Sequence, residues 1–151
     1  LKEALVRAAL ELIAEKGPGG FTTEKVFAHA AQEWNSEVQT PIVFQGHLFA
    51  VGKKKRGLFT CVARDGKQVW TSEGKASFEL GSFLLADGMF LILEGKTGVL
   101  RLVEASTAAY KELASAPVLK GPDVWGPLAL SDGKLVVRDL GQMVCLDLKK
   151  R

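Results

Sequence analysis

Two sets of evenly spaced glycines constrain the fold of this 151-residue chain more than any other feature. In the first set, each glycine ends a turn between two apolar runs. The three segments that can be laid over one another are TPIVFQGHLFAV (40–51), SFLLADGMFLIL (82–93) and PLALSDGKLVVR (127–138). Their turn glycines are 42 and 45 residues apart and lie at Gly46, Gly88 and Gly133.

The second set of glycines follows the first with nearly the same spacing. Each of these glycines opens a further apolar run, in the segments GLFTCVA (57–63), GVLRLVE (98–104) and GQMVCLD (141–147). They are 41 and 43 residues apart and lie at Gly57, Gly98 and Gly141. Two independent markers therefore indicate one repeat of about 40–45 residues, which is the length of a four-stranded β-propeller blade.

The repeat predicts a mainly β fold over residues 37–151. We expect a partial β-propeller of about three four-stranded antiparallel blades, covering about 38–80, 81–122 and 123–151, with the last blade incomplete. In the middle unit the pattern predicts strands over Phe83–Ala86, Met89–Leu93, Val99–Glu104 and Tyr110–Leu113. Hairpin turns that need positive φ are expected at Asp65-Gly66, Asp87-Gly88 and Asp132-Gly133.

Residues 1–36 follow a different pattern and form a predicted N-terminal helical segment. Leu1, Leu5, Ala8 and Leu12 recur at the spacing of an amphipathic helix. The sequence GPGG at 17–20 ends that helix, and a threonine at 22 or 23 can cap a shorter helix over about 24–32.

Composition excludes several classes of function. The net charge of +3 is too small to indicate a nucleic-acid partner, and no apolar run approaches the roughly 18 residues of a membrane span. Two cysteines cannot make a disulfide framework. Because the chain begins with Leu, we interpret it as a cut domain or fragment, and a lost leader leaves the compartment open.

The segment Gly95-Lys96-Thr97 matches the end of a nucleotide-binding P-loop. A P-loop also needs glycine at position 90, which is Phe90, and a helix after the lysine. The residues that follow, VLRLV, have the pattern of a strand instead. We therefore predict a turn between two strands.

The stretch CVARDGKQVW (61–70) resembles the repeat of pyrroloquinoline-quinone-like (PQQ-like) β-propellers, whose units end in an acidic residue, a short linker, Thr-Gly-Lys and Trp. Here Asp65-Gly66-Lys67 and Trp70 match the end of that motif, with a linker one residue shorter. The middle unit keeps Thr107 but has Ala108 in place of glycine and lacks the tryptophan. The motif's acidic position falls on Ala63, Glu104 and Asp147, so two of the three units fit.

The resemblance implies a structural role more than a chemical one. The family's terminal tryptophan packs between blades, which we carry over only to Trp70. Quinone-binding members have adjacent cysteines and a calcium site, whereas this chain has no adjacent cysteines, so we predict no cofactor, no metal and no catalytic residue. Many members are scaffolds in the bacterial cell envelope. The predicted blade-packing residues are Gly46, Gly88, Gly133, Gly57, Gly98, Gly141 and Trp70.

Residues 1–31 resemble the N-terminal helix of TetR-type regulators. The recognition helix that would read the major groove is missing, because QEWNSEVQTPIVF follows. Residues 1–36 carry four Lys or Arg and five Asp or Glu, so the basic charge that phosphates require is missing too.

Several single residues admit more than one interpretation. Cys61 and Cys145 occupy equivalent repeat positions, too far apart for a disulfide, and we expect both to be buried apolar filler. The basic loop Lys53–Arg56 is either a solvated hairpin tip, which we favour, or an anion-attracting loop. Trp34 and Trp125 are expected to pack as core or inter-blade anchors, with ligand stacking by Trp125 as the alternative. His29 and His47 have no partner at metal-ligand spacing.

Three functions remain as hypotheses from the sequence. The first is a non-catalytic repeat module, a scaffold or protein-binding fragment of a larger propeller, whose open blade faces bind protein, self-associate or are capped by the N-terminal helices. The second is a fragment of a PQQ-dependent oxidoreductase. The third is the remnant of a TetR-type DNA-binding regulator.

Overall fold

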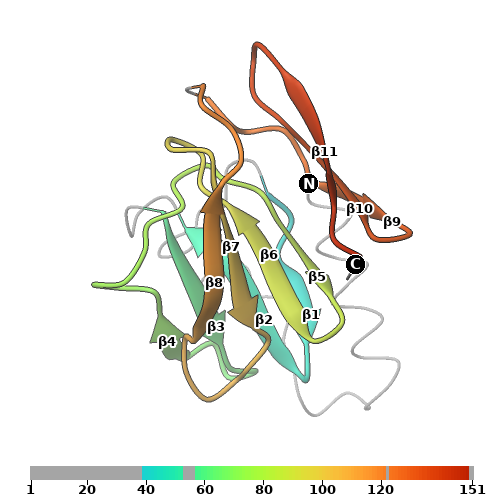
Figure 1. The fold of residues 1–151 in the computed structure, drawn as a ribbon. Helices are drawn as coiled ribbons and strands as arrows, with labels where there is room; N and C mark the ends of the chain where they lie inside the picture. The colour runs from blue at the N-terminus through green and yellow to red at the C-terminus, as the bar shows by residue number, and fades with distance from the viewer. Residues whose placement is uncertain (1–38, 53–56, 122, 150–151) are drawn as a thin grey trace.

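A computed structural model describes residues 39–52, 57–121 and 123–149, which form three antiparallel sheets (Figure 1). The first sheet has the order β1(Ile42–Phe44), β2(His47–Gly52), β3(Leu58–Val62), β4(Gln68–Thr71). The second has the order β5(Phe83–Ala86), β6(Met89–Leu93), β7(Val99–Glu104), β8(Glu112–Pro117). The third has three strands, ordered β11(Met143–Asp147), β10(Lys134–Arg138), β9(Ala129–Ser131).

The mainly β expectation is thus confirmed, with sheets of four, four and three strands. The predicted helical segment 1–36 and the basic loop Lys53–Arg56 lie outside the described residues. Across the ranges that the structure describes, no helix has the length and apolar character needed to cross a membrane.

Three of the four strands expected in the middle unit are confirmed residue by residue, because β5, β6 and β7 have the predicted bounds. The fourth expected strand is present, but its predicted bounds, Tyr110–Leu113, were wrong, since β8 begins at Glu112 and runs to Pro117. The pairing of β7 with β8 shifts register between Leu102 and Val103. Tyr110 precedes the strand and turns its side chain into the core, where it is 5% exposed.

The first hairpin of each sheet closes with the same two-residue turn. The residue before the turn glycine has a φ of 48° in all three, at Gln45, Asp87 and Asp132. The glycines themselves have φ values of 72°, 71° and 73° and are Gly46, Gly88 and Gly133. Two consecutive positive φ angles match the right-handed twist of the flanking strands, which is why glycine and Asp or Asn are favoured there.

The glycines that open the third strands differ among themselves. A Cβ atom on Gly57 would lie 1.9 Å from the main-chain nitrogen of Glu79, and one on Gly98 would lie 2.5 Å from the carbonyl oxygen of Leu119. Gly141 has no such close main-chain neighbour. Its turn is held instead by Asp139, whose Oδ1 accepts hydrogen bonds from the N–H groups of Gly141 (2.7 Å) and Gln142 (2.8 Å).

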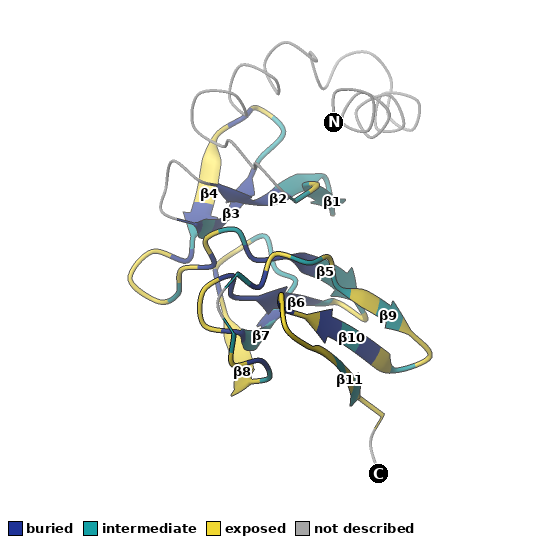
Figure 2. Ribbon diagram, turned by 90° about the horizontal axis from the view of Figure 1, so that it is seen from above, coloured by how far each residue is buried: buried dark blue, intermediate teal, exposed yellow. Residues whose placement is uncertain are grey.

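The three sheets stack face to face, so that the middle sheet is covered on both sides (Figure 2). Strand β6 reflects this, because four consecutive residues, Phe90–Leu93, are buried. Alternate residues of β6 belong to different clusters: Phe90 and Ile92 pack toward the first sheet, Leu91 and Leu93 toward the third. The two larger core clusters are therefore separate interfaces that share one sheet, and a small third cluster of Ala50 and Val62 lies in the first sheet.

The segment Gly95-Lys96-Thr97 lies in the turn between β6 and β7, as predicted. The N–H of Glu94 donates to the carbonyl of Val99 (2.9 Å), and the N–H of Gly98 donates to that of Glu94 (3.1 Å). The hairpin continues directly into β7, so no helix N-terminus is present to receive a phosphate.

Candidate binding groove

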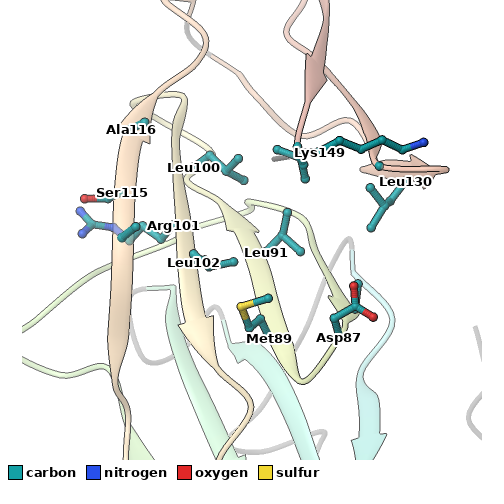
Figure 3. Close-up of a pocket in the computed structure, with 14 residues that line it drawn as sticks. Asp87, Met89, Leu91, Leu100, Arg101, Leu102, Ser115, Ala116, Leu130 and Lys149 are labelled. Carbon is teal, nitrogen blue, oxygen red and sulfur yellow. The ribbon is translucent and has the colours of Figure 1, made fainter. Parts of the chain in front are cut away.

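A groove of about 540 Å³ lies between the second and third sheets (Figure 3). This volume is in the range of small-ligand pockets. The groove is lined mainly by aliphatic side chains of the middle sheet and by residues beside the β9–β10 turn and after β11. The apolar residues among them are Ala86, Met89, Leu91, Leu100, Leu102, Ala114, Ala116, Leu130 and Leu148.

The apolar lining follows from strand alternation. Successive side chains of a strand point to opposite faces of the sheet. Figure 3 shows Leu91, Leu100 and Leu102 directed toward the third sheet. The side chains of Arg101 and Ser115 point the other way, so only their neighbours present apolar groups to the groove.

Strand register identifies the residue that leaves the groove open. In the first sheet Cys61 pairs with Trp70, and the register shifts at the next residue. In the second sheet Leu102 pairs with Ala114, and the register again shifts at the next residue. Ala114 therefore occupies the position that Trp70 occupies in the first sheet.

Three further groove residues are smaller than their counterparts in the first sheet. By the same register, Ala86 replaces Phe44, Leu91 replaces Phe49 and Leu100 replaces Phe59. Together with the Trp70–Ala114 pair, four aromatic rings on one sheet correspond to two leucines and two alanines on the next. The groove is the volume that these rings would fill.

In the first interface those rings form a closed cluster. The centroid of the Trp70 ring lies 5.8 Å from those of both Phe49 and Phe59 and 6.0 Å from that of Tyr110. The Nε1 of Trp70 donates a hydrogen bond of 3.1 Å to the carbonyl of Ser106. Trp70, which is 8% exposed, thus joins the first sheet to the segment after β7.

An ion-pair network lies on the opposite face of β7 from the groove. Arg101 donates through Nε to Glu94 Oε1 (2.6 Å) and through an Nη atom to both carboxylate oxygens of Glu112 (3.0 and 2.8 Å). Burial disfavours the charged form of Glu112, but the hydrogen bonds and positive charge of Arg101, together with hydrogen bonds from Ser115 and Tyr110, outweigh burial and lower the pKa of Glu112. Burial also raises the pKa of Tyr110, which donates to Glu112. Arg101 and Glu112 are therefore both charged at neutral pH and form an ion pair on the face of β7 away from the groove.

The rim of the groove carries one ion pair. The Nζ of Lys149 lies 2.8 Å from Oδ1 of Asp132 in the β9–β10 turn. Both side chains are more than half exposed, so the pair contributes little to stability. The cation is nevertheless placed beside the apolar lining.

The two residues that follow β11 line the groove, and β11 itself has a free edge among the described residues. The N–H of Leu148 donates to the carbonyl of Gly133 (2.8 Å). Because hydrogen-bonded and non-hydrogen-bonded residues alternate in antiparallel pairs, the main-chain groups of Met143, Cys145 and Asp147 point away from β10. The corresponding edges of β3 and β7 are covered by β4 and β8.

The cysteines differ from each other. Cys61 is buried as expected, and burial raises the pKa of its thiol to about 12, so it is a packed, unreactive group. The prediction for Cys145 was wrong, because this residue is exposed. It lies on the outer face of the third sheet, where no described sheet covers it. Within the described ranges, no three His, Cys, Asp or Glu side chains gather to hold a metal ion.

Most of the remaining predicted residues do not line the groove. Gly133 lines it through the β9–β10 turn. Trp125 was expected to be an anchor, but it is 45% exposed in the connection between β8 and β9. The Nδ1 of His47 lies 3.0 Å from the carbonyl oxygen of Gln45 beside its turn. Trp34 and His29 are outside the described residues.

Sequence reasoning missed the groove-forming residues, although one signal was visible: the middle unit lacks the tryptophan of the first. The sequence matches no protein-family model, and no curated protein is significantly similar to it.

Proposed function

We propose that this chain is a non-catalytic β-propeller repeat module that binds another protein through the open side of its third sheet. Three stacked antiparallel sheets with the same first turn and the same strand order support a propeller repeat. The resemblance of residues 61–70 to the PQQ-like repeat supports it independently.

The observation that carries the binding role is an uncovered face. Met143 of β11 corresponds in register to Phe59 in the first sheet, and Cys145 corresponds to Cys61. Phe59 and Cys61 are 0% exposed because the neighbouring sheet covers them, whereas Met143 is 68% exposed. A sheet face that is covered twice among the described residues is left open the third time, and open apolar faces are typical of interaction sites.

Affinity capture tests this proposal. The purified chain is immobilised, incubated with an extract of the source cells and cross-linked, and the cross-linked residues are identified by mass spectrometry. We expect one retained protein whose cross-links fall on the third sheet. Met143→Lys should abolish retention because it places a charge on the uncovered face.

A matched control is Leu113→Lys, which makes the same change at a 45% exposed leucine of β8. This variant should retain the partner. A panel of oxidoreductase and hydrolase substrates is assayed in parallel, with and without added quinone and calcium. Turnover of any of them, or equal retention by the Met143→Lys variant, would overturn the proposal.

A further inference from the structure

We infer that the groove between the second and third sheets receives an aromatic side chain from an extended protein segment that adds to the free edge of β11. The inference rests on the proposed function and names the chemistry of the partner. Two features carry it: the small side chains that replace aromatic rings in the groove, and the edge of β11 that no described strand pairs with.

The groove continues an interface that already exists. Ala86, Leu91, Leu100, Leu102 and Leu130 belong both to the apolar cluster between the second and third sheets and to the groove lining. An occupant would therefore extend a packed surface rather than cover an isolated patch. Because the lining is aliphatic and its rings are missing, an aromatic side chain is the group that restores the packing of the first interface.

Strand β8 and the preceding Tyr110 show how such a segment could bind. In the second sheet, β8 adds antiparallel to β7, and Tyr110 lies just before β8 begins. The ring of Tyr110 packs against Trp70 with centroids 6.0 Å apart. A segment added to β11 as β8 is added to β7 would place its aromatic residue beside Leu148, above Ala114.

The edge of β11 can accept this segment. The main-chain groups of Met143, Cys145 and Asp147 face outward, in register with those of Leu100, Leu102 and Glu104 on β7. On β7, the N–H of Glu104 donates to the carbonyl of Lys111 just before β8 (2.9 Å). In strand addition, main-chain hydrogen bonds provide affinity and side-chain pockets provide specificity, and here both elements lie side by side.

A peptide copied from this chain is the natural probe. The 11-residue segment 108–118, AAYKELASAPV, contains Tyr110 and β8. It is titrated to about 1 mM into the ¹⁵N-labelled full chain, and amide shifts are followed by NMR. Two further peptides carry Tyr110→Trp and Tyr110→Ala.

We expect saturable shifts at Ala114, Leu130, Cys145 and Leu148. The Trp peptide should bind at least as tightly as the Tyr peptide, and the Ala peptide about tenfold more weakly or worse, because it buries no ring.

Protein variants separate the groove from the edge. Ala114→Trp should fill the groove and weaken binding about tenfold or more, whereas Ala129→Trp, which adds the same ring at an exposed position of β9, should not. Cys145→Pro removes one outward N–H from an edge strand, where proline is tolerated, and should also weaken binding. If that variant does not fold, a peptide with N-methylated main-chain nitrogens tests the same hydrogen bonds.

Three results would overturn the inference. The first is the absence of saturable shifts, or shifts insensitive to Ala114→Trp and to loss of the tyrosine. The second is that free indole binds as tightly as the tyrosine peptide, which would indicate that the groove binds a small molecule. The third is self-association that Ala114→Trp abolishes, which would make a second copy the occupant. In each case, the proposed function would still hold if the chain retains a protein partner in affinity capture and the Met143→Lys variant does not.

Discussion

The two interfaces of this protein are built on the same register but from different side chains. The first is aromatic, with seven rings at equivalent repeat positions: Phe44, Phe49, Phe59, Trp70, Phe78, Phe83 and Phe90. The second has aliphatic residues at all seven: Ala86, Leu91, Leu100, Ala114, Leu119, Leu128 and Leu135. Because the strands pair in the same register, the smaller side chains of the second interface leave space unfilled, and that space is the groove.

The comparison separates what a repeat needs for folding from what it can vary. Both interfaces keep the turn glycines and the antiparallel order, and both bury their central residues, such as Phe90 in the first and Leu135 in the second, each 0% exposed. The largest reductions in side-chain size, from Phe44 to Ala86 and from Trp70 to Ala114, are both at positions that line the groove. Loss of large side chains there leaves the fold intact and opens a surface.

The largest expected effect is at the centre of the aromatic interface. Phe59→Ala should lower the free energy of unfolding by about 4 kcal/mol, because it removes a fully buried ring and leaves a closed cavity. Its register counterpart, Leu100→Ala, should cost only about 1–2 kcal/mol, because Leu100 borders a groove that is already open. Urea unfolding followed by circular dichroism measures both. Equal losses would show that the two interfaces are packed alike.

The next largest effect is expected from a substitution that opens a similar groove in the first interface. Trp70→Ala reproduces the situation of Ala114 and should lower the free energy of unfolding by about 3 kcal/mol. It should also create a new site for an apolar dye between the first and second sheets, because the remaining rings cannot close the space. Dye fluorescence of the folded variant, against that of the unsubstituted chain, gives the readout. Unchanged dye binding would mean that the first interface collapses around the vacancy.

These comparisons also show which parts of the fold could be predicted. The glycine spacing and the apolar runs are local signals, and they placed β5, β6 and β7 correctly. The start of β8 was not predictable in this way, because it depends on a register shift opposite Leu102 that only strand pairing reveals. Local pattern gives strands, and pairing decides where they begin.

Burial was less predictable than strand position, for a physical reason. Cys61 and Cys145 have equivalent places in the repeat, yet one is buried and the other exposed. The difference arises from the neighbouring sheet, which covers Cys61 and has no described counterpart over Cys145. The groove has the same origin, since it depends on which side chains face each other across two sheets.

A smaller effect is expected at the ion pairs that lie on the aromatic side of β7. Arg101→Ala should lower the free energy of unfolding by about 1–2 kcal/mol, because it leaves the 8% exposed side chain of Glu94 without its cation. Lys134→Ala, which removes a half-exposed pair with Asp147 on the third sheet, is the matched control and should cost under about 1 kcal/mol. Urea midpoints compare the two. A larger loss at Lys134 would reverse the expected order.

Filling the groove should have an effect of opposite sign. Ala114→Trp restores the ring that the first interface has and should raise the free energy of unfolding by about 1 kcal/mol, as cavity filling commonly does. Ala129→Trp on the outer face of β9 should leave it unchanged. Thermal unfolding of both variants, followed by circular dichroism, tests this. If Ala114→Trp lowers the stability and Ala129→Trp does not, the side chains of the second interface are packed too closely for an aromatic ring to fit.

The smallest expected effect is the pH dependence of the same ion-pair network. The pKa of Glu112 in the folded chain is below its ordinary value of 4.5, so between those two values the unfolded chain binds more protons than the folded one. The contribution of Glu112 to stability is therefore complete above pH 4.5 and is lost as the pH falls through the folded pKa. Other carboxylates with lowered pKa values, such as Asp139 and Asp147, add the same trend. Without Arg101, Glu112 should lose its acid-dependent contribution to stability. Between about pH 7 and pH 3, the free energy of unfolding, measured with urea, should therefore fall less in Arg101→Ala than in the unsubstituted chain, by less than about 1 kcal/mol. Parallel declines in the two proteins would place the acid sensitivity of the fold outside the aromatic interface.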